Sequence, residues 1–394
     1  MYSLLRHPFR LLRQKNIHTW AGPWLRHAIR TAATEAARRA TGHQSLRHLC
    51  FCFCDHFEPE WAGAGPAVGE ARVAAWQRGY PRAFSSFRDA DGRPPQHSFF
   101  FPGEEYRPAY LERLTELCAR GFGEVELHLH HHADTAEALR NKILRFLDQL
   151  GSHGHFSRAE GRLRYAFIHG NWALCNAHRD GTSCGVDEEL ELLFDTGCYA
   201  DFTFPSAPHP TQPRVVNQIY WPIGDLRRAR CYEWAERATV GIRHEDRILL
   251  VQGPLALIFR SGRLLPRIEA AAITAANPPT PERIRCWVRQ GICIEDRPEW
   301  IFVKVHTHGA PEAQAQALLG PPLQQMHQFL HRHYNDGVRW VLHYVTAREL
   351  YNIACAAMDG HEGDPASFRD YLLPPPPVRG TGEADPPTAS PTPG

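Results

Sequence analysis

Short apolar runs with period-two alternation recur along the chain from about residue 47, and each of them predicts a β-strand. Helical runs at residues 109–120 and 136–150 lie between them, and Thr346 with Glu349 forms a capping box that opens another helix. This strand–helix alternation predicts parallel β-α-β units, arranged as a barrel or as a doubly wound sheet. The predicted strands cover residues 48–54, 96–101, 124–129, 165–168, 201–204, 300–305 and 338–345, with 248–251 as a further candidate.

The two ends of the chain differ from this middle part. Residues 1–46 hold eight Arg or Lys against one acid, Glu35, with Leu and Trp interleaved. That mixture is typical of an amphipathic segment on an anionic membrane surface, and equally of a helical extension packed on the main domain, with an RNA-binding arm less favoured. Residues 373–394 are rich in Pro, Gly, Thr and Ser and are predicted to be disordered. The folded domain is therefore expected to span residues 47–372.

Composition narrows the class of protein. The 394 residues are 43% hydrophobic and 22% charged, as expected for a globular protein. A formal net charge of +1 gives no indication of nucleic-acid binding. The longest apolar run, residues 248–259, is interrupted by Gln252, Gly253 and Pro254, so no membrane-spanning helix is predicted.

The cysteines indicate the cellular compartment in which the protein is expected. Cys50, Cys52 and Cys54 alternate along one predicted strand and should share one buried face. The chain has 11 cysteines but no CxxC pair, which makes a structural zinc knuckle unfavourable. With no recognisable secretory leader, we expect reduced thiols in a cytoplasmic protein.

Histidine is the unusual component, with 24 residues, and four of them lie in the segment 126–134. Neutral imidazole is the commonest protein ligand for transition metals. His128 and His132 would lie about 13 Å apart in a straight strand. They reach one metal only if the strand ends there and turns into the next helix, for which Asp134 with Glu137 is the predicted start. The alternative is a His-rich loop or a pH-sensitive surface.

Four more polar clusters follow predicted strands. A strand-end Asp can be a metal ligand or a general base, and a Trp beside Asn and His suits a sugar. At the ends of barrel strands such residues would form a catalytic rim. Each cluster also has a structural alternative, such as a turn cap, a buried Trp or a helix-capping Asn. The clusters are Asp55, His56 and Glu58; His169, Asn171 and Trp172; the Pro-containing loop 201–212; and His306 with His308.

The order of these motifs resembles the polysaccharide deacetylase superfamily, the carbohydrate esterases with the NodB-type fold, over roughly residues 47–350. The resemblance implies a distorted seven-stranded β/α barrel, (β/α)7, in the α/β class. It also implies one divalent metal, usually zinc, held by an Asp and two His, and hydrolysis of an N- or O-acetyl group from a sugar.

The resemblance also implies roles for individual residues. His128 and His132 match the spacing of the family's His-Ser/Thr-x-x-His motif, with Leu129 in place of Ser/Thr. Asp55 matches the general base, and His56 stands where the family has a metal-binding Asp. The implied ligands are therefore His56, His128 and His132, with Asp55 or Glu58 as alternatives for the first. The family's general acid is a histidine at the end of a late strand. It corresponds best to His306, with His308 as the competing choice. His169, Asn171 and Trp172 replace the family's Arg-containing motif and are expected to bind substrate.

These expectations make the chain a divergent deacetylase acting on a carbohydrate, such as a nucleotide sugar or a lipid-linked sugar. A cytoplasmic location, peripheral at the inner face of the membrane through residues 1–46, follows from the same reasoning. Two alternatives remain open at this point. One is a metal-dependent phosphoesterase or amidohydrolase, and the other is a non-catalytic glycan-binding assembly protein.

Overall fold

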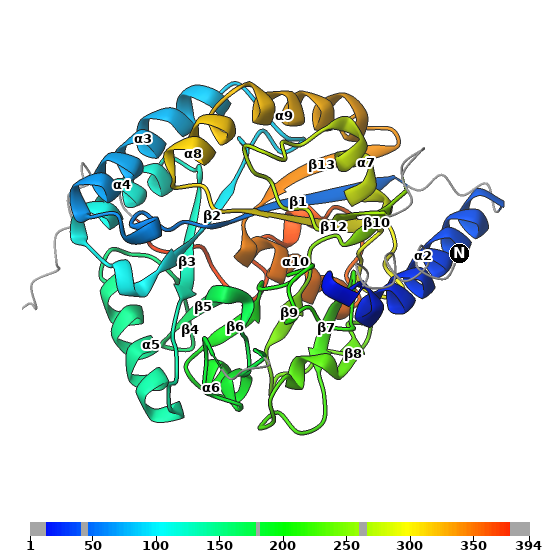
Figure 1. Cartoon of the computed structure of the whole chain (residues 1–394). Coiled ribbons are helices and arrows are strands. Elements are labelled where there is room, and N and C mark those ends of the chain that lie inside the picture. The colour runs from blue at the N-terminus through cyan, green and yellow to red at the C-terminus, as the bar shows by residue number, and fades with distance from the viewer. Residues whose placement is uncertain (1–12, 41–45, 179–181, 260–265, 379–394) are drawn as a thin grey trace, which may run out of the picture.

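The structure is a computed structural model, and it describes residues 13–40, 46–178, 182–259 and 266–378 (Figure 1). Its helices are α2 (Ile17–Ala40), α3 (Pro66–Phe84), α4 (Pro108–Ala119), α5 (Ala136–Gly151), α6 (Glu189–Asp195), α7 (Pro281–Arg289), α8 (Glu312–Leu318), α9 (Pro321–Tyr334) and α10 (Ala347–Met358). Its strands are β1 (Arg47–His56), β2 (His97–Pro102), β3 (Gly123–Leu129), β4 (Ser157–Ala159), β5 (Arg162–His169), β6 (Cys198–Asp201), β7 (Ile219–Pro222), β8 (Ala235–Arg237), β9 (Leu249–Val251), β10 (Ala256–Ile258), β11 (Arg267–Glu269), β12 (Trp300–Thr307) and β13 (Trp340–Val345).

A large, mostly parallel sheet forms the centre of this mixed α/β fold. Strands β12-β1-β2-β3-β5-β6-β9 follow one another in space, and every pairing along this path is parallel. Strand β13 runs parallel to β1, whereas β7 and β8 add an antiparallel edge beyond β9. In the part of the chain that the structure describes, no ladder joins β9 to β12, so a closed barrel is not confirmed. The strand predicted at residues 201–204 lies instead at Cys198–Asp201.

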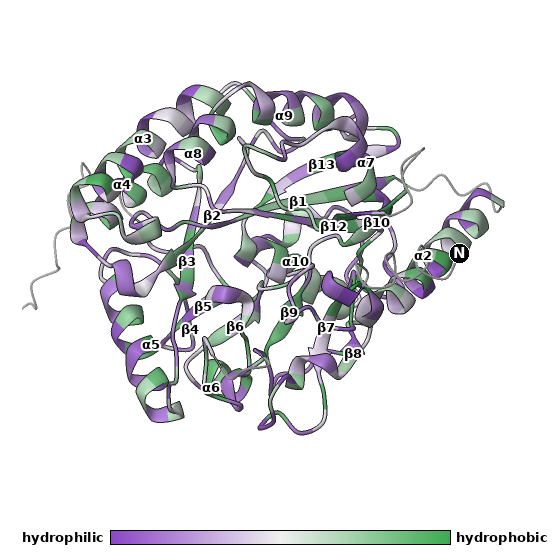
Figure 2. Ribbon diagram, viewed as in Figure 1, coloured by the Kyte–Doolittle hydropathy of each residue, from purple (hydrophilic) through white to green (hydrophobic). Residues whose placement is uncertain are grey.

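Both faces of the sheet are buried. Along β1, Cys50, Cys52 and Cys54 face one apolar core, and the residues between them face the other. The shared cysteine face predicted from the sequence is confirmed, and the cysteines are free thiols in buried positions. Helices α3, α4, α5 and α9 cover one face, whereas α10, every residue of which is buried, packs in the other core. Figure 2 shows the same division, with apolar strands inside and helices that are polar on their outer sides.

Local capping signals explain where two of the helices begin. Thr346 and Glu349 form the predicted capping box at the start of α10, which confirms that prediction. The start predicted for α5 is wrong by one residue, because the side chain of Thr135, not Asp134, accepts the hydrogen bond from Ala138 N. Asp134 instead pairs with Lys142, at 2.7 Å.

The described part of the basic N-terminal segment is a helix packed on the main body. Ile17 and Trp20 of α2 are buried in a small apolar cluster with Val216 and Leu255. This contact matches the helical-extension alternative for residues 13–40. Residues 1–12, and residues 379–394 of the predicted tail, lie outside the described residues. Among the helices described, none has the length and apolarity needed to cross a bilayer.

One pH effect arises from the end of β6. Burial raises the pKa of Asp201 to about 7, although hydrogen bonds from Thr203 and the charge of Lys304 oppose the shift. The folded protein thus holds this proton more tightly than the unfolded chain, whose aspartate has the ordinary value of 3.8. We therefore expect the contribution of Asp201 to the free energy of unfolding to fall as the pH rises from about 4 to about 7. Urea unfolding across that range should show that the stability of the wild type relative to Asp201→Asn falls as the pH rises, and a constant difference between the two proteins would contradict this assignment.

Candidate metal centre

Polar side chains from three strands converge at the carboxyl edge of the parallel sheet. Parallel neighbours end at the same edge, so the residues that complete β1, β3 and β12 come together although they are far apart in sequence. We call this group the strand-end centre. It consists of His56 and Glu58 after β1, His128 and His130 at the end of β3, and His306 and His308 at the end of β12.

Glu58 lies in the middle of the strand-end centre. Its Oε1 is 3.4 Å from His128 Nε2 and 3.1 Å from His130 Nε2. Its Oε2 accepts a hydrogen bond of 2.8 Å from His308 Nδ1. The carboxylate is 2% exposed. The ligand atoms of Glu58, His128 and His130 all lie within 4.8 Å of one another, a spacing that one metal ion could bridge.

The outer nitrogens of the two imidazoles are held by other groups. His128 Nδ1 donates to the carbonyl of Ile168 at 2.8 Å, and His130 Nδ1 donates to Glu104 Oε1 at 2.7 Å. Each ring therefore turns its Nε2 towards Glu58, and His128 Nε2 is buried without a hydrogen-bond partner. Metal-binding histidines have this arrangement, with one nitrogen bonded to a carbonyl or carboxylate and the other free for the ion.

Burial and charge set the protonation of the strand-end centre. Burial raises the pKa of Glu58, but interactions with His128, His130 and His308 outweigh it and hold the pKa well below its usual range. Burial, helped by His308 and His128, lowers the pKa of His56 well below 6.5. Burial also lowers the pKa of His130, but Glu104 and Glu58 outweigh it and raise the pKa to about 10. An ionised carboxylate is thus ready for a cation, which would displace the His130 proton.

Asp55, the predicted general base, lies outside the strand-end centre. Successive side chains of a strand point to opposite faces, and here His56 faces the centre whereas Asp55 faces away. The buried Asp55 carboxylate accepts hydrogen bonds from His97 Nε2 at 2.9 Å and from the Gly309 amide at 2.6 Å. It therefore ties β1 to β2 and to the loop that follows β12.

The predicted pair His128 and His132 is also separated. His132 is exposed, and its Nδ1 accepts from the Ser183 amide at 2.9 Å. Strand β3 ends at Leu129, and His130, the first residue after it, joins His128 at the centre. Sequence reasoning missed the role of His130, although residues i and i+2 of a strand share one face and carried the signal.

The two late histidines differ in accessibility. His306 is 8% exposed, and burial, followed by nearby Lys304, lowers its pKa well below 6.5. The side chain of His308 is 28% exposed, and its ring centroid lies 5.0 Å from that of Trp61 and 6.5 Å from that of Trp172. Solvent, and hence a substrate, reaches His308 more readily than His306.

The three predicted substrate residues have different surroundings. Trp172 lies beside His308, as expected for a residue that contacts substrate at the centre. Asn171 is exposed in a short 3-10 turn with φ of 55°. His169 is fully buried and faces Glu189. The structure thus brings one of these three side chains to the strand-end centre.

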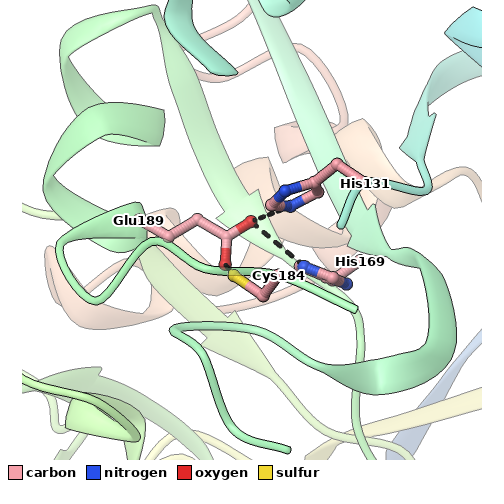
Figure 3. Close-up of side chains that lie close together, drawn as sticks. All are labelled: His131, His169, Cys184 and Glu189. Atoms are coloured by element: carbon pink, nitrogen blue, oxygen red, sulfur yellow. Dashed lines mark hydrogen bonds and ion pairs between the residues drawn. The ribbon is translucent and has the colours of Figure 1, made fainter. Parts of the chain in front are cut away.

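His169 belongs to a second group of side chains, which we call the inner cluster (Figure 3). The inner cluster consists of His131, His169, Cys184 and Glu189, all buried, with ligand atoms within 4.8 Å of one another. Burial raises the pKa of the Cys184 thiol, and Glu189 raises it further. The sequence did not reveal this cluster, because its members come from the loop after β3, the end of β5 and the start of α6 with the residues just before it.

A cavity of about 380 Å³ beneath α2 is lined by many arginines, among them Arg30 and Arg237. It borders Arg47, the first residue of β1, and so lies at the opposite end of the strands from the strand-end centre. Arg30 and Arg237 both pair with Glu295, and Arg47 pairs with Glu35. Three of the arginines that line this cavity therefore have acidic partners, and two of these share Glu295.

A third metal-capable group in the described residues contains His48, His343 and Asp364. Its two imidazoles bond to each other at 2.9 Å, and Asp364 is exposed. His343 is bonded to Asp91 through its other nitrogen, at 2.7 Å. The facing nitrogens of these two histidines are therefore bonded to each other, whereas His128 Nε2 in the strand-end centre has no hydrogen-bond partner.

Comparisons of this chain with protein-family models, with curated proteins and with solved structures found no match. No family is identified by these comparisons. The function is therefore inferred from the chemistry of the site, beginning with the donors around Glu58.

Proposed function

We propose that this chain is a metal-dependent hydrolase that removes an acetyl group from a sugar or glycan intermediate at the strand-end centre. We further propose that the sheet is an opened form of the seven-stranded β/α barrel of the polysaccharide deacetylases, in a divergent subgroup. One observation carries the proposal. Two imidazoles with fixed outer nitrogens meet one buried carboxylate at the carboxyl edge of a parallel sheet.

The donors present fit a catalytic metal. Glu58, His128 and His130 would hold it, and two His with one Glu is a known ligand set of hydrolytic zinc enzymes. A bound divalent metal, for which zinc is the best candidate, would polarise the acetyl carbonyl and lower the pKa of a water molecule. Three protein ligands leave room for water and substrate, which suits a catalytic site better than a structural one.

His308 is the best placed proton carrier of the chain. Its Nδ1 donates to Glu58 Oε2, which fixes the tautomer in which Nε2 is free to take up and return a proton. Its partial exposure lets it reach a leaving amine or alcohol. The sequence favoured His306, but the deeper burial of that ring leaves His308 as the general acid in this proposal.

The aromatic neighbours of His308 favour a sugar as substrate. Trp61 is 43% exposed and Trp172 is partly exposed, and both rings lie beside His308. Exposed tryptophan rings stack on the apolar faces of sugars. The metal would then act on an acetyl group of a sugar held between these rings.

Trp172→Ala is expected to raise KM for the sugar about fivefold while kcat changes little. A stacked ring contributes about 1 kcal/mol, and it binds ground state and transition state alike. Steady-state kinetics measures the change, with Trp234→Ala as the matched control, because Trp234 is also exposed but lies under Arg228, outside the centre. Equal KM values for Trp172→Ala and the wild type would show that the ring does not contact the substrate.

The proposal is tested by acetate release. The full chain would be assayed with N- and O-acetylated sugars as isolated, after chelation, and after zinc is restored, beside phosphate esters. We expect acetate release that is lost on chelation, restored by zinc and absent in Glu58→Gln. Release of phosphate without acetate would replace the proposal with a phosphoesterase. Bound zinc without hydrolysis of any substrate would replace it with a binding protein.

A further inference from the structure

We propose that the inner cluster, His131, His169, Cys184 and Glu189, is a second and closed metal site that holds a structural zinc ion. This site is separate from the strand-end centre and does not depend on the reaction proposed there. Its four side chains come from the loop after β3 (His131), the end of β5 (His169), the segment that leads into α6 (Cys184) and the first residue of α6 (Glu189).

The spacing of the donor atoms fits one tetrahedral ion. Glu189 Oε1 lies 3.1 Å from His131 Nε2 and 3.4 Å from His169 Nε2, and Glu189 Oε2 lies 3.5 Å from Cys184 Sγ (Figure 3). Donors around a tetrahedral zinc are separated by about 3.3–3.8 Å. The cluster therefore needs little rearrangement to bind the ion.

One atom of the cluster lacks a partner that a metal would supply. His169 is fully buried, its Nδ1 is bonded to the Gly170 carbonyl, and its Nε2 has no hydrogen-bond partner. Because Nδ1 donates its proton to that carbonyl, Nε2 of the neutral ring carries the lone pair. A buried lone pair that faces a carboxylate is unfavourable unless a cation lies between them.

The surrounding groups are arranged as an outer shell. His131 Nδ1 lies 3.3 Å from Asp134 Oδ2, and Glu189 Oε2 accepts the Cys175 amide at 2.6 Å. The amides of Asn176 and Val186 point at Cys184 Sγ, at 3.3 and 3.5 Å. Amides directed at sulfur favour a thiolate, and a bound metal displaces the thiol proton.

Burial distinguishes this site from the strand-end centre. All four donors are buried, and four protein donors would complete the coordination of one zinc ion, which is the pattern of structural zinc sites. The ion would pin the residues around Cys184, just before α6, against the ends of β3 and β5. His169 lies three residues before Trp172, and His131 directly follows His130, so the inner site would support the position of both Trp172 and His130 at the strand-end centre.

Cobalt spectroscopy of the full chain tests the inference, together with the metal content. Of the two sites, only the inner cluster offers a thiolate, so cobalt there gives a thiolate-to-metal charge-transfer band in the near ultraviolet. We expect about two zinc ions per wild-type chain when both sites are filled. We expect the cobalt band in the wild type and in His128→Ala, whose metal content should fall to about one.

Cys184→Ser is expected to lose the band and the inner metal. Cys118→Ser is the matched control, because Cys118 is also a buried thiol but lies in α4, and this variant should keep both. If Cys184→Ser is insoluble, the presence or absence of the cobalt band in the wild type and in His128→Ala decides whether the inner site binds metal. Absence of the band from cobalt-loaded wild type, or its persistence in Cys184→Ser, would overturn the inner site. Failure of hydrolysis with the band intact would overturn only the proposed function.

Discussion

His128→Ala is expected to remove the metal of the strand-end centre and to lower kcat/KM for an acetylated sugar about 1,000-fold or more. A catalytic metal contributes several kcal/mol of transition-state stabilisation, and each 1.4 kcal/mol corresponds to a factor of ten in rate. His128 is fully buried, and its Nε2 has no other partner, so no neighbouring group replaces it. Metal analysis and steady-state kinetics on the purified full chain measure both effects.

His132→Ala is the matched control for this prediction. It removes an imidazole from the same segment, but His132 is exposed and bonded to the Ser183 amide. We expect its metal content to equal that of the wild type and its kcat/KM to change less than about twofold, as for most exposed positions. His130→Ala should instead resemble His128→Ala. If His132→Ala loses the metal and His130→Ala retains it, the ligand set drawn from the structure is wrong.

Much of the fold could be predicted because its signals are local. The alternation in residues 48–54 and 124–129 identified β1 and β3, and the capping box identified the start of α10. Closure of the sheet is not a local property. It depends on contacts between distant strands, and hydropathy patterns carry no information about whether the last strand meets the first.

The candidate site was predicted only in part, and the residues at the end of β1 show why. The sequence placed Asp55, His56 and Glu58 after β1, but it could not say which of them faces the neighbouring strands. In the structure His56 and Glu58 reach the centre and Asp55 does not. The partner of His128 also depends on the path of the chain after Leu129, and in the structure that path brings His130, not His132, to the centre.

The inner cluster could not be predicted from the sequence. Its residues are separated by up to 58 positions, from His131 to Glu189. No motif of fixed spacing joins them, and only the meeting of three segments in space brings them together. His169 was therefore interpreted as a residue of the substrate site, because a histidine at a strand end fits either environment.

Asp55→Ala is expected to lower the free energy of unfolding by about 3 kcal/mol while leaving the metal content unchanged. The buried carboxylate accepts from His97 Nε2 and from the Gly309 amide, and its removal leaves both donors unpaired in the core. Loss of one partner of a buried network is among the few single changes with an effect of this size. Denaturant unfolding and metal analysis of the full chain measure the two quantities.

Asp55→Asn separates this structural role from the general-base role implied by the family resemblance. The amide oxygen of Asn can still accept from Gly309, and its NH2 group can donate to His97 if the ring changes tautomer, since His97 Nδ1 has no partner. If Asp55 has only a structural role, Asp55→Asn retains kcat within a few-fold, because the loop that carries His308 stays in place. If Asp55 is the general base, the kcat of Asp55→Asn falls about 100-fold or more at unchanged stability, and the acidic limb of the pH–rate profile is altered. Because the Asp55 carboxylate points away from His56 and Glu58, we expect the first outcome, and the proton carriers would then lie among the histidines that surround Glu58.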